Sequence, residues 1–195
     1  MSQPQSTLAV IFVATALTYP NIGEALQRAG WEVRAVEQDD GSAMAAAHML
    51  VVEGCTDLPS SRPDQLLAAV VDGAKDTGCA ADLRIDPSQP IAQMAEEFRL
   101  WLPPDMSSLA RMEALFGRDA LLPVVQGLRA ELDQTVAGTT VPDAHRMAGL
   151  AGTLGFAAAS ESWQAMDRGT GDQAAALRDS RTTLIAIDRW LAEDS

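Results

Sequence analysis

The chain has 195 residues, of which 47% are hydrophobic and 21% are charged, a balance typical of a folded globular protein and not of a disordered or fibrous one. It carries 27 acidic and 14 basic residues, a formal net charge of −13, which repels phosphate backbones and anionic lipid, so neither nucleic acid nor a membrane is expected as a partner. Two cysteines and two histidines are too few for a zinc cluster or a disulfide framework, so no metal or other cofactor is expected.

The expected location is the cytoplasm. The most apolar run, residues 8–17, is too short to span a bilayer, and neither Lys nor Arg precedes it as a signal peptide requires. Cys55 and Cys79 are therefore interpreted as reduced thiols, with a bridge between them as the alternative that no sequence pattern indicates.

The first half of the chain alternates short apolar runs with helical stretches, which predicts an α/β domain with a partly parallel sheet, a receiver-like or other small flavodoxin-like layer. Strands are predicted over residues 8–14, 31–36, 49–53 and 81–85, and helices over 21–29, 63–75 and 91–101. Four prolines, at positions 87, 90, 103 and 104, flank the last helix. We therefore divide the chain into domains 1–103 and 104–195.

The second half carries almost only helical periodicity. Apolar residues recur at spacings of three and four in four stretches: Leu109, Met112 and Phe116; Leu121, Val125, Leu128, Leu132 and Val136; Met147, Ala151, Leu154 and Ala158; Leu177, Leu184, Ile187 and Leu191. Short connections at 137–140 and 169–171 are rich in Gly, Thr and Ser. This pattern predicts an all-α, up-down helical bundle.

A candidate site lies at the start of the third stretch. Residues 140–143 have the pattern of a helix start, with a Thr cap, a proline in the first turn and an acid three residues after the cap. His145 then falls just past the first turn, opposite the apolar positions, with Gly149 and Gly152 on its own face. Glycine in a helix costs about 0.8–1 kcal/mol relative to alanine, so bare backbone here favours the close approach of another chain; tight packing against a neighbouring helix is the alternative.

The run 144–156, AHRMAGLAGTLGF, resembles the signature of histidine-containing phosphotransfer (HPt) domains, H-x-L-K-G followed by small residues and L-G. The resemblance covers about residues 104–195 and implies a four-helix bundle with an extra N-terminal helix. It also implies that His145 is the phosphoacceptor of a two-component phosphorelay, which accepts a phosphoryl group from a receiver aspartate and passes it to another receiver. The implied receiver-docking face comprises Arg146, Ala148, Gly149 and Gly152.

One position departs from the HPt pattern, because the lysine expected three residues after the histidine is Ala148. Arg146 is a poor substitute, since it points about 95–105° away from the histidine around the helix. The rival hypothesis is therefore an inactive HPt-like adaptor that binds a receiver or a histidine kinase without phosphotransfer. In the active form the partner receiver brings Mg²⁺ in trans, and a hybrid histidine kinase is a further expected partner.

The order of elements in the first half resembles a receiver or another flavodoxin-like layer with its chemistry missing. No acidic pair follows the first strand, Glu53 ends the third strand where an aspartate is needed, and Lys75 is the chain's single lysine. We therefore predict a degenerate receiver-like domain, in which Glu53 either mimics a phosphorylated aspartate or is a surface carboxylate. A small-ligand sensor that gates access to His145 is a further hypothesis. His48, before a strand, is expected to be structural or exposed.

Overall fold

A computed structural model of the chain describes residues 7–37, 41–54, 64–71 and 81–192. The chain divides into two compact units, Met1–Leu102 and Pro103–Ser195. The boundary lies one residue before the position that the prolines indicated. The predicted thiols Cys55 and Cys79, and Lys75, lie outside the described residues.

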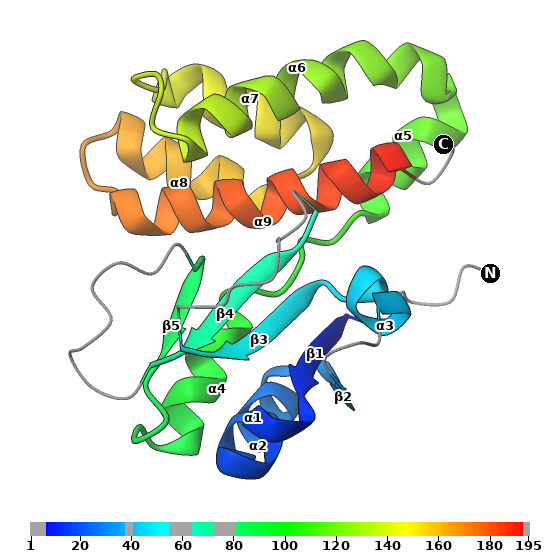
Figure 1. Cartoon of the computed structure of the whole chain (residues 1–195). Helices are drawn as coiled ribbons and strands as arrows, with labels where there is room; N and C mark the ends of the chain where they lie inside the picture. The colour runs from blue at the N-terminus through cyan, green and yellow to red at the C-terminus, as the bar shows by residue number, and fades with distance from the viewer. Residues whose placement is uncertain (1–6, 38–40, 55–63, 72–80, 193–195) are drawn as a thin grey trace. The chain divides into compact units, whose positions relative to one another are not determined.

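The first unit contains a five-stranded sheet with the order β2-β1-β3-β4-β5 (Figure 1). Its strands are β1 (Leu8–Phe12), β2 (Glu32–Val36), β3 (Met49–Glu53), β4 (Leu66–Val70) and β5 (Leu83–Ile85), and every neighbouring pair is parallel. This strand order is that of flavodoxin-like, doubly wound layers. The predicted α/β class is confirmed.

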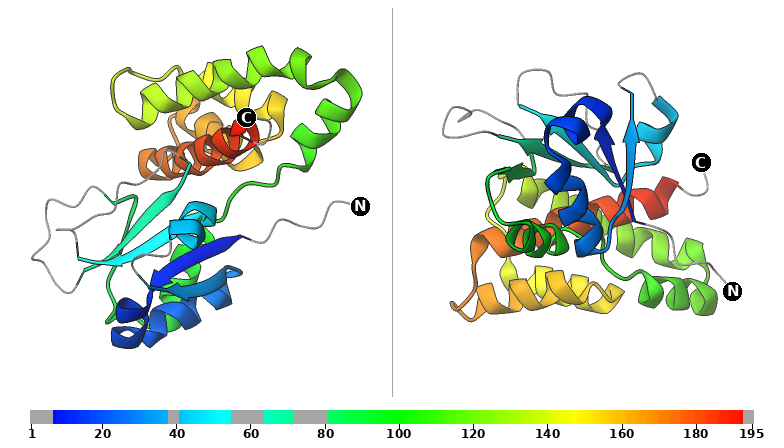
Figure 2. Two further views of the ribbon diagram at one scale, coloured as in Figure 1. Left: turned by 45° about the vertical axis from the view of Figure 1, so that its right-hand side comes forward. Right: turned by 90° about the horizontal axis from the view of Figure 1, so that it is seen from below.

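Helices cover both faces of this sheet. On one face α2 (Pro20–Ala29) and α4 (Ile91–Arg99) pack side by side, as the right-hand view of Figure 2 shows. The short helix α1 (Val13–Thr18) precedes α2. The other face forms an apolar cluster that includes Val10, Leu50 and Leu67 together with Ala43 of α3 (Gly41–Ala46). Successive strand residues point to opposite faces of the sheet, so the strands contribute side chains to an apolar core on each face, as in other parallel sheets buried on both faces.

The predicted helix over 63–75 is wrong, because the described part of this segment contains the strand β4. All five β4 residues are buried, and a continuous apolar run of this kind has no period that distinguishes a central strand from a buried helix. The first strand also ends earlier than predicted, at Phe12, where α1 takes over, and α3 was not predicted.

His48 has a structural role at the start of β3. The His48 side-chain Nδ1 accepts a hydrogen bond from the Leu8 backbone N–H at 3.3 Å, and the His48 backbone N–H donates to the Leu8 carbonyl at 2.8 Å. These bonds join the first residue of β1 to the residue before β3. Histidine is therefore used here as a backbone partner, in agreement with the sequence interpretation.

The second unit is an all-α bundle, as predicted. It comprises α5 (Ser107–Phe116), α6 (Arg118–Val136), α7 (Ala144–Leu154), α8 (Ala157–Asp167) and α9 (Gln173–Ala192). The last four helices close a ring of neighbours, α6 on α7, α7 on α8, α8 on α9 and α9 on α6, and α5 packs on α6. Their shared core includes Val125, Leu132, Met147, Trp163 and Ile187.

Three positions of the predicted apolar stripes are exposed and do not contribute to this core. Phe116 and Val136 lie at helix ends and are exposed, and Ala158 is an exposed residue of α8. The third stripe stops at Leu154 because Gly155 adopts a left-handed conformation, with φ of 86°, and ends α7. An alanine there is strained, which explains glycine at this helix end.

A polar brace joins α5, α6 and α9. The Arg118 guanidinium lies 3.8 Å from the centre of the Trp190 ring and forms an ion pair with Glu113 at 3.3 Å. The Trp190 indole N–H donates to the Glu113 carboxylate at 2.9 Å. Because each residue has two partners, the brace fixes the extra helix α5 to the ends of α6 and α9.

Candidate functional site

The helix that carries His145 begins at an aspartate. Asp143 is the N-cap of α7, and its carboxylate accepts a hydrogen bond from the Arg146 backbone N–H at 3.0 Å. The predicted Thr140 cap is therefore wrong, because the Asp143 carboxylate reaches the third N–H of the helix and starts it three residues later. His145 is consequently the second residue of α7, inside the first turn and not just past it.

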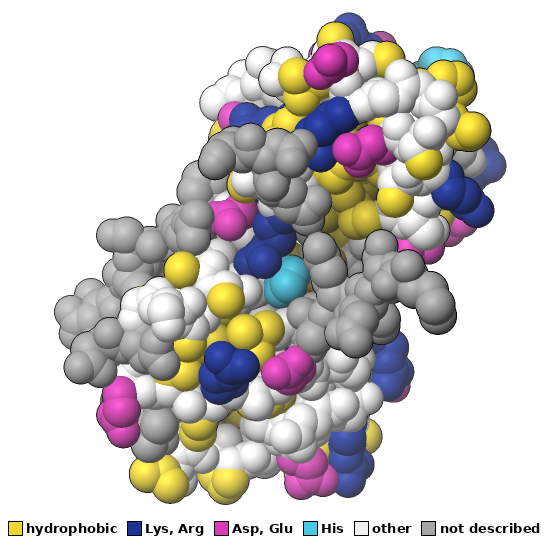
Figure 3. Space-filling model, turned by 90° about the vertical axis from the view of Figure 1, so that its right-hand side faces the viewer, with side chains coloured by type: hydrophobic (Ala, Val, Ile, Leu, Met, Phe, Trp, Pro, Cys, Tyr) yellow, Lys and Arg dark blue, Asp and Glu magenta, His cyan; other side chains and the backbone are white. Residues whose placement is uncertain are grey.

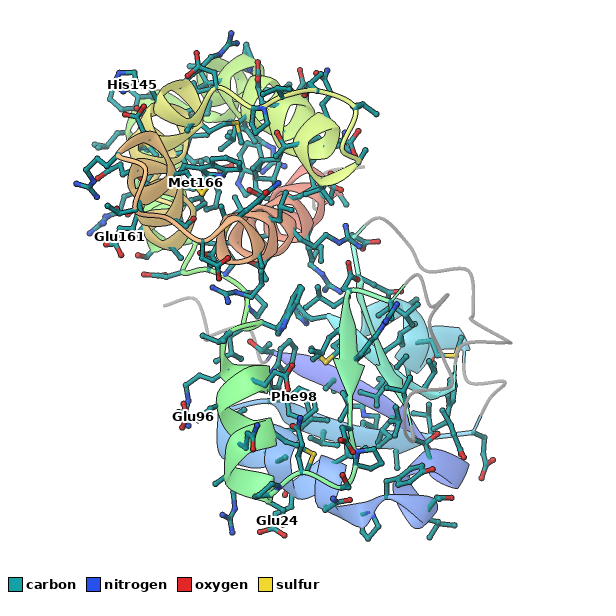
Figure 4. All side chains as sticks on the ribbon, turned by 90° about the vertical axis from the view of Figure 1, so that its left-hand side faces the viewer. Glu24, Glu96, Phe98, His145, Glu161 and Met166 are labelled. Atoms are coloured by element: carbon teal, nitrogen blue, oxygen red, sulfur yellow. The ribbon has the colours of Figure 1, made fainter. Side chains whose placement is uncertain are left out.

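The His145 side chain points away from the bundle and is 88% exposed. Figure 4 shows it projecting outward, whereas Met166 of α8 points into the bundle. Two residues along, Met147 is buried in the core, which fixes the rotation of α7 about its axis. The outward histidine inferred from helical periodicity is present.

An aspartate from the next helix lies beside the imidazole. The carboxylate of Asp167, the last residue of α8, lies with Oδ2 3.2 Å from His145 Nδ1. Among the described residues no hydrogen bond is formed to His145 Nε2, on the other side of the ring from the Asp167 carboxylate. Asp167 was not predicted from the sequence. The predicted antiparallel arrangement of α7 and α8 could have indicated it, because this arrangement returns the end of α8 to the start of α7.

Arg146 is exposed but committed to another helix. Its guanidinium forms an ion pair with Glu131 of α6 at 2.7 Å, on the side of α7 away from α8. It therefore does not replace the missing lysine beside His145, in line with its angular offset.

The two glycines of α7 have different surroundings. A Cβ placed on Gly149 would meet no atom within 4 Å, whereas one on Gly152 would lie 2.9 Å from Ser160 Oγ. The missing side chain of Gly152 therefore allows the neighbouring helix α8 to pack closely, as the alternative explanation for the glycines predicted. Gly149 leaves open space on the surface, one turn along from His145, and so remains compatible with the approach of a partner.

Ala148 does not belong to an exposed docking face. It is 6% exposed, and its carbonyl accepts the Ser160 hydroxyl at 2.9 Å. Its position between the exposed face and the core explains this: α8 packs directly over it. The implied docking face of Arg146, Ala148, Gly149 and Gly152 is thus corrected at Ala148, which is buried. Gly152 is exposed, and its missing Cβ also leaves room for Ser160 of α8.

The first unit shows no comparable constellation in the part that the structure describes. Glu53 is exposed at the end of β3, and β1 continues into the helix VATALT, which has no acid. Among the described residues no group of three or more His, Cys, Asp and Glu could hold a metal ion. Glu53 thus has the surroundings of a surface carboxylate.

Neither sign of charge dominates the one face of the molecule that Figure 3 draws. Acidic and basic side chains of the described residues are interspersed with apolar ones on the face drawn in Figure 3.

Within the described residues no helix has the length and apolar character needed to cross a membrane. Comparison of the chain with known protein families, curated proteins and solved structures found no match. The assignment of function therefore depends on the residues of α7 and α8.

Proposed function

We propose that the chain is a histidine phosphotransfer protein, in which His145 accepts a phosphoryl group from a receiver aspartate and passes it to another receiver. The observation that carries this proposal is the exposed imidazole in the first turn of a bundle helix, with its Nε2 open to solvent. A nucleophile that must reach into a second protein's site needs this exposure. The HPt-like run around His145 and the open space at Gly149 support the same function.

The chemical step requires little from this chain. The Nε2 lone pair attacks the phosphorus of the receiver's aspartyl phosphate, the N–P bond forms, and the P–O bond to the aspartate breaks with the carboxylate as leaving group. The receiver holds the Mg²⁺ that neutralises phosphoryl charge. This chain supplies position and an unobstructed approach.

The helix start offsets part of the missing lysine charge. The N–H groups of the first helical residues lack partners within the helix, and Asp143 occupies only that of Arg146. Helical side chains lean toward the N-terminus, so an anion on His145 lies near the positive end of α7. This interaction is worth about 0.3–1 kcal/mol at an exposed site.

Phosphotransfer from labelled receivers tests the proposal. The full chain is incubated with a panel of receiver domains that carry ³²P on aspartate, in the presence of Mg²⁺. We expect label on the unaltered protein and on His48→Gln, which changes the chain's other histidine, and none on His145→Gln. Equal, negligible labelling of the unaltered protein and His145→Gln by every receiver would refute the proposal.

The adaptor hypothesis is favoured by one observation, the absence of a lysine three residues after His145. It predicts that a receiver or a histidine kinase binds the chain without labelling it and that His145→Gln leaves this binding unchanged. Pull-down and labelling in the same incubation therefore separate the two functions.

A further inference from the structure

The Asp167 carboxylate is placed by the fold beside one particular nitrogen of His145. Its Oδ2 lies 3.2 Å from Nδ1, and the Asp167 side chain is about half buried while the imidazole is exposed. The distance is that of a hydrogen bond between a ring nitrogen and a carboxylate oxygen. The other ring nitrogen, Nε2, is directed away from it.

The two residues are held together by packing on both sides. Met147 anchors the start of α7 in the core, and Met166, adjacent to Asp167, packs against the same core from the end of α8. Between the two helices, Ser160 donates its hydroxyl to the Ala148 carbonyl. The pair therefore rests on a fixed helix hairpin and not only on two surface side chains that happen to meet.

A carboxylate beside Nδ1 determines which nitrogen can act as the nucleophile. A neutral imidazole has its proton on one nitrogen and its lone pair on the other, and an ionised carboxylate can only accept a hydrogen bond. A proton on Nδ1 is therefore favoured, which leaves the lone pair on Nε2. The geometry points to Asp167 as a positioning residue that holds His145 in the tautomer with a nucleophilic Nε2.

This inference rests on the proposed function and assigns Asp167 a part in it. When Nε2 attacks the phosphorus, the N–P bond forms, the receiver carboxylate leaves and the proton remains on Nδ1, between the ring and Asp167. Positive charge that develops on the ring then lies next to a negative carboxylate. The reverse step, transfer to a second receiver aspartate, passes through the same arrangement.

The first test measures the tautomer. NMR of the full chain with ¹⁵N-labelled histidine rings, at about pH 8.5 where an ordinary histidine is neutral, is expected to show the His145 proton on Nδ1. Asp167→Ala is expected to shift it toward Nε2, whereas Asp167→Asn retains it through the amide oxygen. The control Asp119→Ala removes an exposed aspartate from the first turn of α6 and leaves the tautomer unchanged. An unchanged tautomer in Asp167→Ala would overturn the inference.

The second test measures which nitrogen is phosphorylated. Phosphoramidate needs no partner protein: the ring nitrogen forms the N–P bond while the P–N bond of the reagent breaks and ammonia leaves. By ³¹P NMR we expect phosphate on Nε2 of the unaltered protein and a mixture of Nε2 and Nδ1 products in Asp167→Ala. Transfer from a receiver is expected to fall about 10-fold in Asp167→Ala, by analogy with the lower end of the loss seen when a partner that orients a metal-binding histidine is removed.

The outcomes separate the two proposals. If the receivers label no variant but Asp167→Ala shifts the tautomer, the phosphotransfer function fails and the placement of the proton by Asp167 stands. If the unaltered protein is labelled and Asp167→Ala changes neither the tautomer nor the rate, phosphotransfer stands and the role of Asp167 is refuted.

Discussion

Alanine substitutions at the two glycines of α7 are expected to change stability in opposite directions. At Gly149 a Cβ meets no atom within 4 Å, so Gly149→Ala gains the helix propensity of alanine, about 0.8–1 kcal/mol. At Gly152 the same gain is opposed by Ser160 Oγ, which would lie 2.9 Å from the new Cβ. Overpacking of this kind costs about 1–3 kcal/mol, and we expect a net loss of about 1 kcal/mol.

The contact at Gly152 can be relieved at its other side. Ser160 is buried, and its hydroxyl is bonded to the Ala148 carbonyl at 2.9 Å, so it cannot move away without losing that bond. Ser160→Ala removes the hydroxyl and leaves Ser160 Cβ at 3.6 Å, an ordinary contact. In that background Gly152→Ala is expected to stabilise, which gives a coupling of about 1–2 kcal/mol between the two sites.

Urea unfolding of the full chain, followed by circular dichroism, measures these free energies. The difference between Gly149→Ala and Gly152→Ala is expected to be about 2 kcal/mol, the sum of a gain and a loss of about 1 kcal/mol each. If Gly152→Ala stabilises the protein as much as Gly149→Ala, or if the double-mutant cycle shows no coupling with Ser160, then the close approach of α8 does not explain Gly152.

Three further predictions concern the ends of bundle helices. Asp143→Ala removes the α7 cap and is expected to lower the free energy of unfolding by about 1 kcal/mol, whereas an unchanged urea midpoint would contradict this. Gly155→Ala combines a left-handed φ with a Cβ 2.2 Å from that of Ser108 and is expected to cost about 2–4 kcal/mol; a loss below about 1 kcal/mol would refute it. The Ser107 hydroxyl, and to a lesser extent the Ser107 backbone N–H, donate hydrogen bonds that lower the pKa of Asp105. The ionised Asp105 carboxylate therefore stabilises the protein down to pH values below the ordinary aspartate range, and this stabilisation is lost as pH falls through the lowered pKa. An NMR titration midpoint for Asp105 at or above the ordinary aspartate value would contradict this.

Local patterns predicted the bundle better than the sheet. The outward position of His145 follows from helical period alone, because Met147 and Leu154 must face the core. The strand β4 has no such period, since its five residues are buried on both faces, and its parallel pairing with β3 depends on distant segments. The order of the strands in the sheet therefore cannot be predicted from local sequence patterns.

The candidate site was predicted in part for the same reason. Sequence spacing places residues of one helix on a face, and it identified His145 and Gly149. Asp167 belongs to another helix, 22 residues away, and reaches the imidazole only through the turn between α7 and α8. Ala148 was misplaced because the side of α7 that α8 covers depends on the packing of α8, not on the period of α7.

The separation of packing residues from partner-facing residues allows a steric test of docking. Gly149 lies on the open surface one turn from His145, and a side chain there meets no atom of its own protein. Gly149→Leu is therefore expected to fold normally, because leucine is also a good helix former. A docked receiver, in contrast, would meet the leucine before its aspartyl phosphate reached Nε2.

Two phosphoryl donors of different size distinguish obstruction from chemical damage. Gly149→Leu is expected to lower the rate of labelling from receivers at least 10-fold, because a 1 Å misplacement of reacting atoms can cost about 100-fold, while phosphoramidate labels His145 at an unchanged rate. Gly149→Ala, with a smaller side chain, should fall between the unaltered protein and Gly149→Leu. A parallel loss with both donors would indicate damage to the imidazole, and no loss with either would exclude Gly149 from the surface that a receiver covers.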